Sequence, residues 1–395
     1  FFTIFILTGM FSGLLSSYLH KAPKRNYCDF RVYYATGQRF LAKGDIYARP
    51  DEAITPFKYS PAFAMCFAPL ALVSQKAASV IFFIINFCAM LSALMVCKRM
   101  IVRAPISFRA TVFLYGLTGL VGSRFLLNVL YSGQVTIAMF FLIIAGLYCV
   151  EKKREAAAGA LIALSVMIKY TSAVFLPYFI ARRRRSIAIL VLIFAVLFCL
   201  LPAIHVGLDR ETQYLKKWLP FISETSLDRG SWFDYKNQSL FSMVLRFTTK
   251  DSPYNIAIIP LSFAQGLGVG LFFAVIIYGL ILFKKGNNKY ADMADYCLLF
   301  ICMALFNPNA WMTNFTFLIP GYMLVIYYLM KARFKDIPIL ILCVLSFALG
   351  SWGSESVVGE ALEDILEKFS TITFSGLLLM AALFRLKWKK RVEAS

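Results

Sequence analysis

Long apolar stretches alternate with short polar ones along almost the whole chain of 395 residues. A membrane-spanning helix needs ~20 mostly apolar residues, and fewer when it crosses only half of the bilayer. The pattern therefore predicts an all-α polytopic membrane protein, a bundle of about 10–12 transmembrane helices with extracytoplasmic loops. The apolar segments are about 1–19, 74–97, 107–121, 134–150, 156–168, 171–181, 186–204, 255–283, 293–306, 315–330, 337–351 and 371–384.

Clusters of Lys and Arg separate these segments, and such clusters favour the cytoplasmic side of a membrane. If they share that side, the chain is a single multi-pass domain, 1–395, of the inner (cytoplasmic) membrane. Its extracytoplasmic segments are then about 20–73, 205–254 and 352–370. The clusters are Lys98 with Arg99 and Arg103, Lys152 to Arg154, Arg182 to Arg185, Lys284 with Lys285, Lys331 to Lys335, and Arg385 to Arg391.

One interval between basic clusters is too short for two full spans. Only 27 residues, 155–181, lie between Arg154 and Arg182. We expect two short helices that enter the bilayer and return, with Lys169 near the apex. A lysine at depth is unfavourable unless it faces a cavity or an anion, although it can also reach the interface along its own aliphatic stem.

Composition narrows the class of protein. Apolar residues make up 60% of the chain and charged residues 16%, whereas a soluble domain has about 45–50% and about 25%. The net charge of +20 comes from clusters between apolar segments, so we do not expect a nucleic-acid partner. With two His and no Cys/His cluster, we expect no metal site and no cofactor.

The first outer segment combines groups suited to a phosphorylated sugar. Eight Lys or Arg lie between Lys21 and Lys58, which favours an anionic ligand such as a lipid phosphate, although long loops also cross the membrane regardless of charge. Aromatic faces can cover a sugar, cations can hold phosphate oxygens, and a carboxylate can accept a hydroxyl proton. The residues concerned are Asp29, Arg31, Tyr33, Tyr34, Phe57, Lys58 and Tyr59.

Three further polar groups follow outer ends of apolar segments, on the side predicted for Asp29. Convergence of such groups on one side of the membrane is typical of a binding site, although helix caps are also polar. The groups are Arg124 with Asn128, Tyr131 and Gln134; Asp234 to Leu240 with Arg246; and Asn307 to Asn314, which includes Trp311.

In order, these motifs are Asp-Phe-x-x-Tyr-Tyr at 29–34, Gly-Asp-x-Tyr at 44–47, Phe-x-Tyr-x-Pro-x-Phe at 57–63, and Gly-Gln at 133–134. With Lys169 and the Asn-Gln-Ser-Leu at 237–240 followed by Arg246, they resemble the bacterial polyprenol-phosphate-mannose-dependent mannosyltransferases. That family is glycosyltransferase family eighty-seven, of the GT-C superfamily, and the resemblance covers about 1–330.

The resemblance implies an inverting, metal-independent glycosyltransferase of the extracytoplasmic face. It would move a sugar, expected to be mannose, from a polyprenyl-phosphate donor in the surrounding membrane lipids to a lipid or glycan acceptor. Asp29 matches the family's catalytic base. One position departs from the family, because Asn314 stands where many members carry His.

The resemblance and the chemistry of the side chains together suggest three roles for residues of the site. Asp29 is the expected catalytic residue. The expected donor-phosphate ligands are Arg31, Lys58, Lys169, Arg124 and Arg246. The expected substrate-binding residues are Tyr33, Tyr59, Gln134, Lys236, Asn237, Gln238, Trp311 and Asn314.

Two other classes of protein remain open at this stage. A transporter or flippase for an anionic glycolipid would show inverted repeats with buried charges at the bilayer midplane. The chain shows no convincing repeat, and its polar residues gather on one predicted face. A membrane scaffold subunit would leave the loop motifs unexplained.

Overall fold

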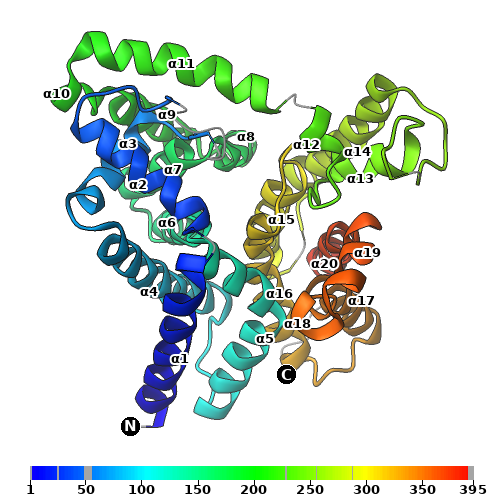
Figure 1. Ribbon diagram of the computed structural model, residues 1–395. Coiled ribbons are helices and arrows are strands. Elements are labelled where there is room, and N and C mark those ends of the chain that lie inside the picture. The colour runs from blue at the N-terminus through cyan, green and yellow to red at the C-terminus, as the bar shows by residue number, and fades with distance from the viewer. Residues whose placement is uncertain are drawn as a thin grey trace.

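The computed structural model describes residues 2–24, 26–48, 56–226, 229–254, 256–286 and 288–389. It is an all-α protein, and the described residues contain no strand beyond an isolated bridge between Thr249 and Leu261. Figure 1 shows two groups of helices, α1 to α11 on one side and α12 to α20 on the other. The predicted all-α polytopic fold is confirmed.

The first group of helices contains most of the sequence motifs. Its members are α1 (Phe2–Lys24), α2 (Cys28–Leu41), α3 (Pro61–Phe67), η1 (Ala68–Leu72), α4 (Gln75–Ile101), α5 (Phe108–Ser132), α6 (Thr136–Glu151), α7 (Glu155–Ile168), η2 (Tyr170–Val174), α8 (Phe175–Ala181), α9 (Arg185–Leu200), α10 (Ala203–Val206) and α11 (Leu208–Ser226).

The second group closes the bundle and contributes one wall of the site. Its members are α12 (Arg229–Phe233), α13 (Leu240–Thr248), α14 (Phe263–Phe283), α15 (Ala291–Leu305), η3 (Met312–Leu318), α16 (Ile319–Lys331), α17 (Ile337–Phe347), η4 (Ala348–Trp352), α18 (Glu355–Val358), α19 (Glu360–Lys368) and α20 (Thr371–Trp388).

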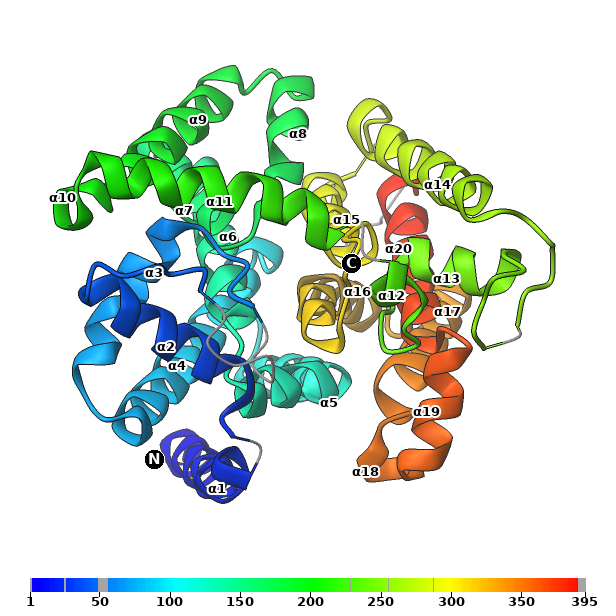
Figure 2. The same cartoon turned by 45° about the horizontal axis from the view of Figure 1, so that its top comes forward.

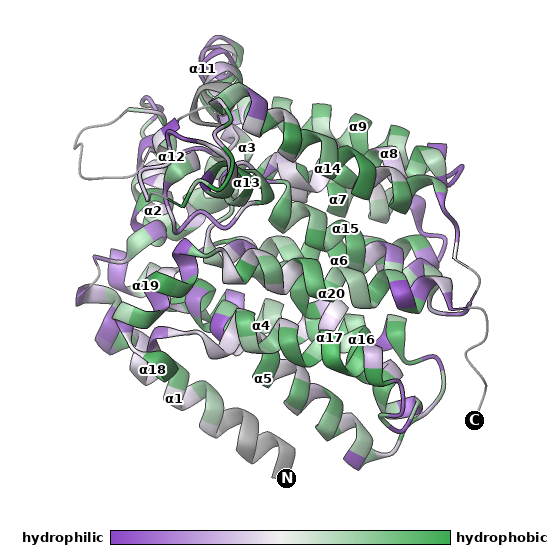
Figure 3. Cartoon of the chain, turned by 90° about the vertical axis from the view of Figure 1, so that its right-hand side faces the viewer, coloured by the Kyte–Doolittle hydropathy of each residue, from purple (hydrophilic) through white to green (hydrophobic). Residues whose placement is uncertain are grey.

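Six helical segments in the described residues are long and apolar enough to cross a bilayer, and five shorter apolar segments accompany them. Figure 3 shows an apolar band between two polar ends. The ends of α2, α12, α13, α18 and α19 lie at one of these polar ends. The six long segments are Gln75–Ile101, Phe108–Ser132, Arg185–Val206, Phe263–Phe283, Met312–Lys331 and Thr371–Trp388.

The helix pair expected between Arg154 and Arg182 is present. Helix α7 ends at Ile168, Lys169 adopts an extended conformation (φ −141°, ψ 124°), and η2 leads into α8. An ion pair fixes the C-terminal end of α8, because Arg182 lies 2.5 Å from the buried Asp295. Asp295 also pairs at 2.6 Å with Lys387, near the end of α20. The pair therefore starts and ends at the basic end of the bundle, with Lys169 at its apex.

One span is longer than its hydropathy predicts. The apolar segment was expected to end near residue 121, but α5 continues to Ser132 and stops at Gly133, which has φ +63°. A Cβ at this glycine would lie 2.7 Å from the Cβ of Phe30, too close for any side chain. Gly133 thus lets the end of α5 approach α2 closely, which places Gln134 beside Asp29.

Candidate active site

Asp29 lies in the first turn of α2, directly after an unusual backbone conformation. Asn26, Tyr27 and Cys28 all have φ between 43° and 58°. These values lie in the left-handed region, which residues other than glycine rarely adopt. Such strain costs ~1–3 kcal/mol per residue and persists only where the surrounding structure enforces it. Here Phe30, fully buried against the rings of Phe67 and Phe82, fixes the start of α2.

Helical spacing decides which residues of α2 share a side with Asp29. Residues three and four positions later lie on the same face, and Val32 and Tyr33 accordingly line a cavity together with Asp29. Arg31, two positions later, is not among the lining residues. The structure therefore does not bring Arg31 into the site as the sequence analysis expected.

Three hydrogen-bonded side chains form one wall beside Asp29. The hydroxyls of Tyr33 and Tyr59 lie 2.8 Å apart, and Gln134 Nε2 donates to the Tyr59 hydroxyl at 3.3 Å. Gln134 Oε1 accepts from the backbone N–H of Val135 at 2.8 Å and from the Thr136 hydroxyl at 3.3 Å. These two acceptor contacts fix the amide orientation, so its N–H groups face Tyr59 and Asp29.

Lys169 enters the same cavity from the apex of the helix pair. Its Nζ lies 3.5 Å from Thr136 Oγ1 and 3.5 Å from Asn314 Oδ1, and both partners are neutral. Asn314 is itself oriented by donating through Nδ2 to the backbone oxygen of Asn309 at 3.2 Å. Neither hydrogen-bond partner neutralises the ammonium, so its charge can act on an anion in the cavity.

The cavity has a volume of about 170 Å³, well above the ~10–15 Å³ that a single water molecule needs. Among its described lining residues, only Asp29, Lys58 and Lys169 carry charge. The wall is otherwise aromatic and amide-rich. The lining residues are Asp29, Val32, Tyr33, Pro56, Lys58, Tyr59, Gln134, Ile168, Lys169, Tyr170, Thr171, Trp218, Asn307, Asn309, Trp311 and Asn314.

The cavity changes the acidity of Asp29. Burial raises the pKa of this carboxyl above its ordinary value of 3.8, while Lys169, Gln134 and Lys58 act in the opposite direction. A carboxylate with a raised pKa is a stronger proton acceptor. Asp29 is therefore a stronger proton acceptor than a solvent-exposed aspartate.

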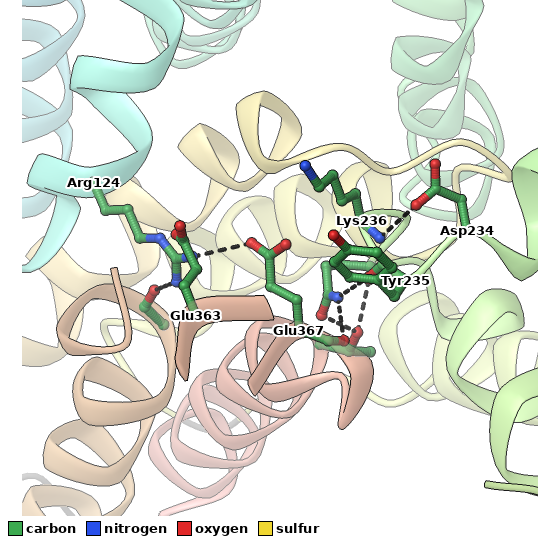
Figure 4. Close-up of polar contacts among 9 residues, drawn as sticks. Arg124, Asp234, Tyr235, Lys236, Glu363 and Glu367 are labelled. Atoms are coloured by element: carbon green, nitrogen blue, oxygen red, sulfur yellow. Dashed lines mark hydrogen bonds and ion pairs between the residues drawn. The ribbon is translucent and has the colours of Figure 1, made fainter. Parts of the chain in front are cut away.

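Arg124 lies outside the cavity and is already paired. Its guanidinium donates to the backbone oxygen of Gly350 at 2.7 Å, to Glu363 at 2.5 Å and to Glu367 at 3.1 Å (Figure 4). The side chain is buried with these two carboxylates, so it joins α5 to α19. This neutralised arginine does not fit the donor-phosphate role that the sequence analysis gave it.

Arg246 also has a structural position. It is fully buried and donates to the backbone oxygens of Asp234 and Asn237 at 3.0 and 2.9 Å, and to the Ser370 hydroxyl at 2.6 Å. All these partners belong to the loop before α13 or to the start of α20. Arg246 thus organises the wall and does not face the cavity, contrary to expectation.

Three expected substrate ligands of the same loop lie outside the cavity lining. Asn237 donates to the backbone oxygen of Pro308 at 2.8 Å and accepts from the N–H of Ala310 at 3.0 Å, which positions the cavity-lining Asn307 and Asn309. Gln238 donates to the backbone oxygen of Glu367 at 2.8 Å. Lys236 is exposed, with its Nζ 5.7 Å from the centre of the Tyr235 ring. None of the three lines the cavity.

The structure also adds residues that the sequence analysis did not select. Asn307 and Asn309 belonged to a polar group noted in the sequence, so their position could have been anticipated. Trp218 carried no such signal, because it lies on α11, far from every motif. The added lining residues are Pro56, Ile168, Tyr170, Thr171, Trp218, Asn307, Asn309 and Val32. Over the described residues, no group of three or more His, Cys, Asp or Glu is placed to hold a metal ion.

Comparison with known proteins gives two matches. Residues 57–308, more than half of the chain, match the sequence model described as Glycosyltransferase family 87. The chain is also 23% identical over 357 residues to a protein of Mycolicibacterium smegmatis, with 87% of this chain and 76% of that protein covered. That relative is named polyprenol-phosphate-mannose-dependent alpha-(1-2)-phosphatidylinositol mannoside mannosyltransferase. No solved structure matches significantly.

Proposed function

Because the chain belongs to glycosyltransferase family 87, we propose that it transfers mannose from a polyprenyl-phosphate donor to a hydroxyl of a lipid-linked acceptor at the extracytoplasmic face. The enzyme class, a membrane glycosyltransferase that uses a polyprenyl-phosphate sugar, follows from the family and from the relative. The sugar, the acceptor and the side of the membrane are the parts we propose.

The observation that carries this proposal is the charge of the cavity. Lys58 and Lys169 contribute two positive charges, and ionised Asp29 contributes one negative charge. The described lining residues therefore carry a net charge of +1, which complements a phosphodiester with its one negative charge. A polyprenyl-phosphate sugar is such a phosphodiester, so its head group fits this cavity electrostatically.

The charges of Asp29, Lys58 and Lys169 also balance those of the reaction products. The acceptor oxygen forms a bond to the anomeric carbon, and the bond from that carbon to the phosphate oxygen breaks. Asp29 takes the hydroxyl proton and becomes neutral, while the departing phosphate monoester gains the second negative charge. The two lysines then face a dianion, so the summed charge of the described lining residues and the reactants is zero before and after the transfer. Fixed cations placed where charge develops stabilise the transition state.

The single carboxylate supports inversion at the anomeric carbon. A retaining transfer through a covalent intermediate uses a second carboxyl group as nucleophile. Asp29 is the only carboxylate among the described lining residues. A single displacement, with Asp29 as the base, therefore needs nothing further from the cavity.

Sidedness is inferred from the two ends of the bundle. Arg182 and Lys387 pair with Asp295 at the end away from Lys169 and its cavity. Since basic residues favour the cytoplasmic side, the cavity would open on the extracytoplasmic side of the inner membrane. The mannose donor and a lipid acceptor are proposed from the name of the relative.

Incubation of the purified protein with polyprenyl-phosphate mannose and a native lipid extract tests the proposal. Mass spectrometry should show glycolipids heavier by one hexose. The Asp29→Asn protein is the matched control and should form this product at least about 10²-fold more slowly. Absence of any hexose increment with the wild-type protein, under conditions where it is folded and binds donor, would overturn the assignment.

A further inference from the structure

Helix α11 covers the cavity from a distant part of the sequence. Figures 1 and 2 show it running from α10, on the side of α2 and α3, toward α12. It packs on α3 and brings Trp218 into the cavity wall, with only 8% of that residue exposed. Access to Asp29 on this side therefore depends on where α11 lies.

The turn after α2 holds α11 in place. The Tyr214 hydroxyl donates to the backbone oxygen of Gly44, and Lys217 Nζ lies 2.5 Å from Asp45 Oδ2. The other oxygen of Asp45 accepts from the backbone N–H of Tyr47 at 3.1 Å, which fixes the turn. The Gly-Asp-x-Tyr motif at 44–47, which takes no part in the proposed chemistry, thus acts as a latch for α11.

The N-terminal end of α11 has the features of a hinge. Gly207 separates α10 from α11 with φ +85° and ψ 156°, and no heavy atom would lie within 4 Å of a Cβ there. Before the hinge, His205 Nε2 lies 3.3 Å from the backbone oxygen of Leu41, which ties α10 to the end of α2. Rotation at Gly207 would move α11 and leave α10 attached.

Two buried polar groups under α11 have no hydrogen-bond partner in the described part of the chain. The first is the carboxylate of Glu211, which is 2% exposed and has neither oxygen hydrogen-bonded. The second is the indole N–H of Trp218. A buried polar group without a partner opposes the arrangement that buries it. Burial of these two groups therefore disfavours the position in which α11 covers the cavity, and the contacts of Tyr214 and Lys217 with the 44–47 turn favour it.

Among the described residues, no positively charged group contributes to the pKa of Glu211. The titratable groups facing it are Tyr47, Cys199 on α9 and Tyr214 on α11 itself. Burial alone raises the pKa of Glu211 to about 7. Of the other elements packed on α11, α10 carries His205, which contacts Leu41, and α3 carries Cys66, which is exposed.

We propose that α11 is a hinged cover over the active-site cavity, latched by the 44–47 turn and released when Glu211 loses its proton. The inference rests on the proposed function, since the cavity it covers is the proposed catalytic one. A closed cover excludes water while the sugar is transferred, and an open one admits the sugar head group and releases the product.

The direction of the pH effect follows from proton binding. Covered Glu211 keeps its proton up to about pH 7, whereas an exposed Glu keeps it only to about 4.5. The covered state thus binds more protons between these values, so it weakens as pH rises from about 4.5 to about 7. Below that window Glu211 is protonated in both states, and above it the ionised carboxylate disfavours the covered state by an amount that no longer changes with pH.

Hydrogen–deuterium exchange of the full-length protein in detergent tests release directly. We expect amides of 209–219 to exchange at least about tenfold faster at pH 8 than at pH 5, after correction for intrinsic exchange. Glu211→Gln, which cannot ionise, should abolish this difference. Asp209→Asn, which removes an exposed acid from the same helix, should retain it. Equal exchange of the wild type at both pH values, or a persistent difference in Glu211→Gln, would overturn the proposal.

A reversible crosslink tests whether release matters for turnover. Asp45→Cys with Lys217→Cys can be joined by a cleavable bifunctional thiol reagent, because a disulfide needs Cβ atoms only ~3.5–4.5 Å apart. Crosslinking should lower turnover at least tenfold relative to the same protein after reduction, and neither single variant should respond. Unchanged turnover of the crosslinked protein would refute the cover. If the wild type transfers no sugar, the proposed function fails, yet the exchange experiment still decides whether α11 opens.

Discussion

The Ser60 hydroxyl donates to the backbone oxygen of Met167 at 2.6 Å, a bond between residues 107 positions apart. Ser60 is fully buried, and its oxygen also accepts from the N–H of Phe63 as the N-cap of α3. It follows Tyr59 directly, and Met167 precedes Lys169 by two residues. One hydroxyl therefore ties the segment that carries Tyr59, in the aromatic wall of the cavity, to the end of α7, just before Lys169.

Ser60→Ala should weaken both the fold and the site. The change leaves the Met167 carbonyl without its partner and α3 without its cap, for an expected loss of about 1–3 kcal/mol in the free energy of unfolding. Turnover per folded molecule should also fall, because Lys169 loses its support. Thermal unfolding and transfer assays on Ser60→Ala and Ser60→Thr check this. Threonine retains the hydroxyl, so an equal loss in both variants would argue against the hydrogen bond as the cause.

Asp29→Asn should abolish chemistry and spare binding. Asparagine keeps the size and polarity of the side chain but cannot accept a proton, and a general base typically contributes about 10²–10⁴-fold to the rate. We expect kcat to fall by at least 10²-fold, with little change in the KM for donor. Near-normal kcat at saturating donor and acceptor would remove Asp29 from the mechanism.

The wild-type enzyme should lose activity as pH falls. Burial raises the pKa of Asp29 above 3.8, and only the ionised carboxylate can take the acceptor proton. A plot of log(kcat/KM) against pH should therefore rise with a slope near 1 through a pKa higher than that of a solvent-exposed Asp. The residual activity of Asp29→Asn should lack this limb. An ascending limb that survives in Asp29→Asn would assign the titration to another group.

Lys58→Met and Lys169→Met should weaken donor binding. Each removes one of the two positive charges in the cavity while keeping an unbranched side chain. The KM for donor should rise more than kcat falls, and added donor should restore much of the rate to a variant that loses only ground-state binding. Arg31→Met is the matched control, since Arg31 does not line the cavity and its loss should leave KM nearly unchanged. A KM effect as large in Arg31→Met as in Lys169→Met would contradict this geometry.

Arg124→Met should destabilise the protein without removing a residue that binds the donor. It leaves the buried Glu367 and the half-buried Glu363 without their cation, and breaking a buried ion pair typically costs about 3–5 kcal/mol. Burial already raises the pKa of Glu367 to about 7. Loss of Arg124 would raise it further, so the variant should be least stable at high pH and partly recover as pH falls and Glu367 is protonated. Melting curves at pH 5 and pH 8 measure this, with the Arg124→Met, Glu363→Gln, Glu367→Gln triple variant as the test of rescue.

The fold class and one unusual element could be predicted from sequence because they depend on length and hydropathy. Apolar segments of about the right length predict spans. The 27 residues between Arg154 and Arg182 exclude two spans, so a broken helix pair with Lys169 at its apex was the remaining solution.

The roles of the arginines could not be predicted in the same way. Sequence shows that Arg124 follows an apolar run, but its partners Glu363 and Glu367 lie more than 230 positions away. Arg246 likewise finds its acceptors in backbone oxygens that only the folded loop presents. Arg31 is different, because its separation of two from Asp29 was visible and helical spacing already argued against a shared face. Trp218 gave no local signal and reached the cavity through the packing of α11.

The buried ion group of Arg182, Asp295 and Lys387 has a consequence for the other end of the molecule. Asp295 anchors both the returning helix α8 and the final helix α20. The reach of Lys169 into the cavity is therefore set partly by Lys387, in the last turn of α20. The last turn of α20 thus supports the helix pair that carries Lys169, so a substitution at Lys387 should change the cavity without replacing any residue that lines it.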